Sequence, residues 1–179
     1  MKKLKLFTTI VFTAITLFAF SQTEKDQKIM SDAENAKQLL QKSDKGLEKF
    51  FESASGYVIF PNVGEGAFIV GGASGNGVLY ENGAPVGMAS LKKVDIGLQA
   101  GGQEIVEIIF FETEEALNEF KQEEIKFSAE ASAIAVKEGA AKNANYNDGM
   151  IIFTKPKKGL MADLSIGGQK FKYTPFDNK

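Results

Sequence analysis

The chain has 179 residues, 44% hydrophobic and 25% charged, which is ordinary for a globular protein and too short for more than one typical domain. All 21 basic residues are lysines, against 23 acidic residues, and this balance without arginine disfavours nucleic-acid binding, which depends on phosphate neutralisation. Cysteine and histidine are absent, which excludes disulfides, lipoprotein anchoring and the common thiol or histidine catalytic centres. We therefore expect no cofactor and no metal site.

The first 21 residues have the layout of a secretory signal peptide. "MKKLK" is basic, "LFTTIVFTAITLFAF" is apolar, and "AFS" before Gln22 is a small-x-small cleavage site. A transmembrane anchor is the alternative, but spanning a bilayer takes about 20 apolar residues and this run is shorter. The sequence thus predicts cleavage near Ser21/Gln22 and an exported, periplasmic protein of residues 22–179 that is not a lipoprotein.

Residues 22–55 are predicted to form a helical arm. Their apolar residues recur every three or four positions, as on one face of an amphipathic helix. "KSDKG" at 42–46 interrupts this pattern, with Ser43 as a candidate N-cap for a second helix that Gly56 ends. The apolar stripe consists of Ile29, Ala33, Ala36, Leu40, Leu47, Phe50, Phe51 and Ala54.

Residues 56–176 are predicted to form a β-rich body. Short apolar segments follow one another, separated by glycine turns at the spacing of an antiparallel meander. Gly75-Asn76-Gly77 resembles one such hairpin turn, and "GMIIFTKPKKGLMADLSIGG" reads as two strands joined by a lysine-proline turn. The predicted fold class is α+β, with an N-terminal helical segment on a long, curled antiparallel sheet that could close into a barrel.

One further helix is predicted near 113–122. Thr113 is a candidate N-cap, and two glutamates follow it at the positive end of the helix. Ala116, Leu117 and Phe120 then share the face that should point inward.

The glycine-rich stretch "IFPNVGEGAFIVGGASGNGVLY" (59–80) does not fit a nucleotide-binding loop. A Walker A loop needs a lysine and a hydroxyl after its last glycine, and a dinucleotide fingerprint needs a third glycine and a following helix. Both are missing here. The glycines are better explained by turns and by close contacts between strands.

Two catalytic alternatives are weak. Ser90-Leu91-Lys92-Lys93 has the S-x-x-K spacing of serine-lysine acyl transfer, but that motif must open a helix and this segment is strand-like, so solvated turn lysines are favoured. A glycosidase would need two convergent carboxylates about 5–9 Å apart. No arrangement of the available acids favours such a pair, and no catalytic residue is predicted; the acids are Asp95, Glu104, Glu107 and Asp163.

Five segments in order resemble the SYLF domain, also called the Ysc84-type lipid-binding domain. They are "GYVIFPNV" (56–63), "VGGASGNGVL" (70–79), "IGLQAGGQ" (96–103), "TEEALNEF" (113–120) and "GLMADLSIGG" (159–168). The resemblance runs from about Ala33 to Tyr173, so residues 22–179 form a single predicted domain. It departs from the family pattern at Asp163, where relatives have glycine. The motif positions implied to be structural are Gly56, Pro61, Gly71, Gly72, Gly75, Gly77, Gly97, Gln99, Gly101 and Gly159.

What the resemblance implies is a non-enzymatic module that binds phospholipid at a membrane surface. Eukaryotic relatives bind phosphatidylinositol lipids and in some cases actin, but actin is not expected as a partner of an exported protein. The expected association with the cell envelope is peripheral. The alternative is a periplasmic protein-interaction or structural module, whose protein partner the sequence does not identify, without lipid binding.

Two sets of residues are candidates for lipid contact. Lys155, Lys157 and Lys158 form a basic turn, which Lys170 and Lys172 would approach if the last strands pair; solubilising lysines are the alternative. The other set lies on the helical arm, and its alternative is that the arm docks on the sheet as ordinary core. Its members are Ile29, Leu39, Leu40, Leu47, Phe50 and Phe51.

Overall fold

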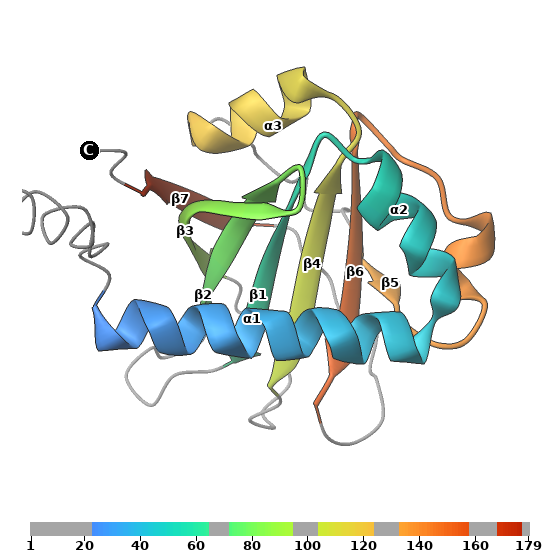
Figure 1. The fold of residues 1–179 in the computed structure, drawn as a ribbon, viewed down its shortest axis with the longest axis horizontal. Helices are drawn as coiled ribbons and strands as arrows, with labels where there is room; N and C mark the ends of the chain where they lie inside the picture. Colours follow the sequence, from blue (N-terminus) through green and yellow to red (C-terminus); the bar gives the residue numbers. More distant parts are fainter. Residues whose placement is uncertain (1–22, 65–71, 95–103, 124–132, 158–167, 177–179) are drawn as a thin grey trace, which may run out of the picture.

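The computed structural model describes residues 23–64, 72–94, 104–123, 133–157 and 168–176 (Figure 1). The predicted signal peptide lies outside these residues, as do Gly71, Asp95, Gly97, Gln99, Gly101, Lys158, Gly159 and Asp163. In chain order the elements are α1 (Glu24–Ser43), the 3-10 turn η1 (Lys45–Leu47), α2 (Glu48–Ser53), β1 (Gly56–Gly64), β2 (Gly72–Glu81), β3 (Ala84–Val94), β4 (Ile105–Phe111), α3 (Glu114–Lys121), β5 (Ile134–Ala135), the 3-10 turn η2 (Ala140–Asn143), β6 (Met150–Pro156) and β7 (Gln169–Pro175).

The seven described strands form one sheet in the order β5-β6-β4-β1-β2-β3-β7. The α+β prediction is confirmed, with two corrections. The sheet is mixed, because β5 pairs in parallel with β6 while the other pairs are antiparallel. It is also open among the described residues, with β5 and β7 at its edges, so the barrel expectation is wrong.

The open sheet is nevertheless curled. The side-chain amide of Gln169 on β7 donates to Glu107 Oε2 on β4 at 3.0 Å, although three strands separate β4 from β7 in the sheet. The Phe60 and Phe171 rings also meet across the sheet, with centroids 5.9 Å apart. Adjacent strands in a flat sheet lie about 4.8 Å apart, so these contacts require strong curvature toward one face.

The glycines of β2 allow close packing rather than a turn. Gly75-Asn76-Gly77 lies inside β2 and pairs with both β1 and β3, so the predicted hairpin turn is wrong. A Cβ at Gly77 would lie 2.4 Å from the Ile59 carbonyl oxygen, beside a bulge in β1. The β2–β3 turn is instead made by Asn82-Gly83, where both residues have positive φ, as a two-residue hairpin turn requires.

Each face of the sheet has its own apolar core. α1 and α2 cover one face, named here the α1 face, and α3 packs on the opposite α3 face (Figure 1). The α1 face carries Tyr57, Ile59, Val78, Tyr80, Val106, Ile108, Phe110, Ile151 and Phe153. The α3 face carries Val58, Phe60, Leu79, Leu91, Ile109, Phe111, Ile152 and Phe171.

The helix starts follow local capping chemistry. Thr23 and Asp26 form a reciprocal capping box at the start of α1, which satisfies backbone donors that the first turn leaves open. The predicted helix near 113–122 is present as α3: the Thr113 hydroxyl accepts from the Ala116 backbone at 3.2 Å, and the predicted inward face is buried. The predicted N-cap at Ser43 is wrong, because Ser43 is the last residue of α1.

Asp44 joins the end of α1 to the η2 turn. Its carboxylate is 3% exposed and accepts backbone N–H groups from Gly46 at 2.9 Å and Ala141 at 2.7 Å. Burial raises the pKa of this carboxyl, but the backbone hydrogen bonds, that of Ala141 first, outweigh burial and hold the pKa below its usual value.

We expect Asp44→Asn to lower the free energy of unfolding at pH 7 by about 1–3 kcal/mol. Because the folded-state pKa is depressed, the carboxylate stabilises the fold above its unfolded pKa of about 3.9 and less as pH falls through the folded pKa. The gap between wild type and variant in urea unfolding should therefore shrink from pH 6 to pH 3. The exposed Asp148→Asn is the control, and a gap independent of pH would contradict the role of the charge.

Candidate lipid-contact surface

The helical arm is docked on the sheet. Leu40 is fully buried and Ile29 is half-buried against the same core, whereas Leu39 is 39% exposed. Leu40 therefore cannot contact lipid while α1 stays docked, and Leu47 and Phe50 are buried in the same way. Within the described part of the chain, no helix is long and apolar enough to cross a membrane.

Among the described strands, β6 and β7 do not pair with each other, so the predicted lysines on them form two separate groups. β6 pairs with β4 and β5, and β7 pairs with β3. Four strands separate β6 from β7 in the sheet. Lys155 and Lys157 lie at or just after the end of β6, whereas Lys170 and Lys172 lie on β7. The expected pairing is therefore absent between β6 and β7, which carry or border four of the five predicted lysines, and Lys158 lies outside the described residues.

Lys170 and Lys172 instead lie beside Lys92 of β3. Lys92 is directly opposite Lys170, and Lys172 is opposite Ser90, so the three lysines share one face of neighbouring strands. All three are exposed, and within the described residues none forms an ion pair. We call Lys92, Lys170 and Lys172 the lysine triad.

Strand alternation explains why the lysine triad shares a face. Leu91 and Phe171 are buried on the α3 face, so the residues beside them in sequence point to the α1 face. Antiparallel pairing then places the side chains of Lys92 and Lys170 about 4.5–5.5 Å apart at Cβ. Like charges directly opposite one another destabilise a sheet, so an anion at this position would relieve repulsion.

Lys157 has a different environment on the β6 side. Its ammonium donates to Asn62 Oδ1 and lies 4.0 Å from Glu104, while its backbone N–H donates to the Glu104 carbonyl at 2.9 Å. Asn62 Nδ2 in turn donates to Asp32 of α1 at 3.4 Å. Lys157 is therefore partly neutralised, whereas Lys155 is half-buried on the α1 face.

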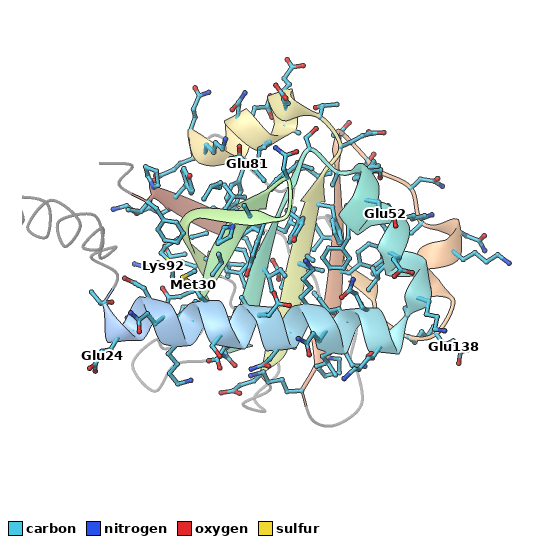
Figure 2. All side chains as sticks on the ribbon, viewed as in Figure 1. Glu24, Met30, Glu52, Glu81, Lys92 and Glu138 are labelled. Atoms are coloured by element: carbon cyan, nitrogen blue, oxygen red, sulfur yellow. The ribbon has the colours of Figure 1, made fainter. Side chains whose placement is uncertain are left out.

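Several lysines gather toward one end of the strands, where Glu104 and Asp32 also lie. Lys92, Lys155, Lys157 and Lys170 lie toward the end where β1, β3 and β6 finish and β2, β4 and β7 begin. The opposite end carries α3, whose Lys121 pairs with Glu81 at 2.6 Å; Figure 2 shows Glu81 beside α3 and Lys92 near α1. The exposed acids of that end are Glu112, Glu114, Glu115, Glu119 and Glu123.

We call the residues Lys92, Lys155, Lys157, Lys170 and Lys172 together the lysine end. The sequence predicted four of its members but not Lys92, which it assigned to a solvated turn. The sequence did contain a sign of this grouping: in the strand segments "SLKK" and "KFKY", alternation places Lys92, Lys170 and Lys172 on the face opposite the buried Leu91 and Phe171. That the two strands pair with each other cannot be read from either segment alone.

The catalytic alternatives find no support in the described geometry. Ser90 and Lys93 both lie within β3, so the motif does not open a helix. Glu104 is exposed before β4, while Glu107 is fully buried within it.

The comparisons with known proteins match parts of the chain. The matching family model is Ysc84, described as Las17-binding protein actin regulator, and it covers residues 92–179. Beta cell expansion factor A of Aeromonas veronii is 34% identical over 83 residues, which are 45% of this chain and 32% of that protein. The match thus spans about a third of the length of this relative. The family match contains all three residues of the lysine triad.

Proposed function

The chain belongs to the Ysc84 (SYLF) family through residues 92–179, and on this basis we propose that it binds anionic phospholipid at a membrane surface. The family is one of lipid-binding domains in general, and the finer assignment is ours. The protein would associate peripherally and without catalysis, with the lysine end toward the membrane. We place it at the periplasmic side of the envelope because of the predicted signal peptide.

The lysine triad is the observation that carries this proposal. Each lysine near an anionic surface contributes about 1 kcal/mol to binding, and those of the triad are exposed and form no ion pair with the acidic residues that the structure describes. The acidic α3 end lies away from the lysine end, so attraction and repulsion both favour one orientation. The net acidity of the chain does not oppose binding in this orientation, because fields are screened beyond about 10 Å at 0.1 M salt.

Vesicle flotation tests the proposal on residues 22–179, the form that the signal-peptide prediction gives. We expect flotation with vesicles containing phosphatidylglycerol and little with pure phosphatidylcholine. Raising the salt concentration to about 1 M should release the protein, because the Debye length then falls to about 3 Å.

Two results would contradict the proposal. Absence of flotation with either lipid would exclude membrane binding and favour the protein-interaction alternative. Equal, salt-insensitive flotation with both lipids would retain a membrane function but exclude the lysine end as its basis.

The actin regulation in the family's description and the role in the name of the Aeromonas protein are not part of this proposal. The first describes the family whose model matches residues 92–179, and the second names a protein of which this chain matches 32%.

A further inference from the structure

The sequence contains two Asn-Gly pairs, which the fold places in different settings. Asn76-Gly77 lies within β2, and Asn82-Gly83 forms the turn between β2 and β3. Both asparagine side chains are exposed, but Gly77 is buried whereas Gly83 is exposed. The two pairs therefore carry the same chemical groups and differ in the backbone that holds them.

An Asn-Gly pair can modify itself without an enzyme. The backbone nitrogen of the glycine bonds to the side-chain carbonyl carbon of the asparagine and loses its proton, and ammonia leaves, which gives a five-membered succinimide ring. Water then opens the ring at either carbonyl, so the products are aspartate and isoaspartate. Glycine favours ring closure because it has no side chain to hinder the nitrogen and its backbone rotates freely.

The strand ladder opposes this reaction at Asn76. Asn76 pairs with Asn62 of β1 and with Ser90 of β3. For the glycine nitrogen to reach the side-chain carbon, the main chain must rotate after Asn76, which breaks pairing on both sides. Space is also tight at Gly77, where an added Cβ would clash with the Ile59 carbonyl oxygen.

The turn imposes no such restraint on Asn82. Glu81 and Ala84 are the paired residues that close the hairpin, so Asn82 and Gly83 lie outside the ladder. Among the described residues other than its chain neighbours, none comes within 4 Å of a Cβ added at Gly83. Exposed turns open locally at little cost in free energy, whereas the centre of a sheet opens at a cost that approaches global unfolding.

We propose that Asn82-Gly83 is a site of spontaneous covalent modification, at which the folded protein converts Asn82 through a succinimide to isoaspartate and aspartate. The product carries one additional negative charge, and isoaspartate also lengthens the main chain of the turn by one atom. The turn lies at the α3 end of the strands, where Glu81 pairs with Lys121 at 2.6 Å. Because neither change touches the lysine triad, this proposal and the membrane proposal can fail independently.

Ageing of the folded full chain at mildly alkaline pH tests the site. Trypsin cuts after lysine, so a single peptide, residues 50–92, contains both asparagines, and its fragment ions distinguish them by mass spectrometry. We expect Asn82 to be converted at least about tenfold faster than Asn76, because an opening cost of about 1.4 kcal/mol at Asn76 already gives that factor. Labelling with an isoaspartyl methyltransferase should detect the isoaspartate, and unaged protein corrects for conversion during digestion.

The same chain unfolded in guanidinium is the matched control, because both pairs should then react at similar rates. In the folded chain, Gly83→Ala should slow the reaction at Asn82, since the added methyl hinders the attacking nitrogen, and should leave Asn76 unchanged. Equal conversion of the two asparagines in the folded chain would assign the reaction to unfolded molecules and overturn the proposal. Conversion of Asn82 in guanidinium alone would show that the turn protects it, and the proposal would again be wrong.

Discussion

Replacing Lys92, Lys170 and Lys172 together by glutamine is expected to weaken binding to phosphatidylglycerol vesicles about a hundredfold. Each lysine near an anionic surface contributes about 1 kcal/mol, and about 1.4 kcal/mol corresponds to a tenfold change in affinity. The three side chains act on the same face of β3 and β7, so they can meet one membrane together. Titration with vesicles at a fixed salt concentration gives the two partition coefficients.

The same triple variant should bind more weakly but be more stable than the wild type. Removing the repulsion between Lys92 and Lys170, which face each other across the strands, should raise the free energy of unfolding by about 0.2–1 kcal/mol. A loss of binding without a loss of stability therefore cannot be ascribed to unfolding.

A second triple variant gives the matched control for net charge. Lys42, Lys45 and Lys137 are also exposed, but they lie around the end of α1 and before η2, outside the lysine end. Their replacement by glutamine should reduce binding far less than replacement of the lysine triad. Equal losses of vesicle binding in the two variants would show that only net charge matters. Unchanged binding of the triad variant would exclude the lysine triad as the contact surface.

Phe110→Ala is expected to lower the free energy of unfolding by about 3–5 kcal/mol. Phe110 is fully buried on β4, and its ring centroid lies 5.5 Å from that of Phe50 and 4.9 Å from that of Phe51. These rings join the central sheet to α2, so the truncation would leave a cavity between the helical arm and the sheet. Urea unfolding followed by circular dichroism measures the change.

Phe51→Ala is the comparison for this prediction. Phe51 is half-buried and contacts the same aromatic cluster from its edge, so its truncation should destabilise the protein less. A change below about 1 kcal/mol for Phe110→Ala would show that the arm does not depend on this contact.

The sequence predicted those parts of the fold that depend on local patterns. The 3.6-residue apolar stripe gave the helical arm, and Thr113 with the buried Ala116, Leu117 and Phe120 gave α3. Both rest on periodicity and capping, which act between residues within one or two turns. The glycines were harder to interpret, because Gly77 serves a contact between strands while Gly83 serves a turn, and spacing alone did not separate the two.

The sequence by itself determined the α+β class and the family motifs, and it marked most of the lysines on which the proposed function rests. Only the tertiary structure decided which lysines meet, because β7 pairs with β3 instead of following β6 as a hairpin. Strand partners are chosen by burial of side chains from the whole sheet, as Phe171 shows by packing with Phe60 and Phe120. The same long-range pairing brings Gln169 next to Glu107, a contact that no local sequence pattern predicts.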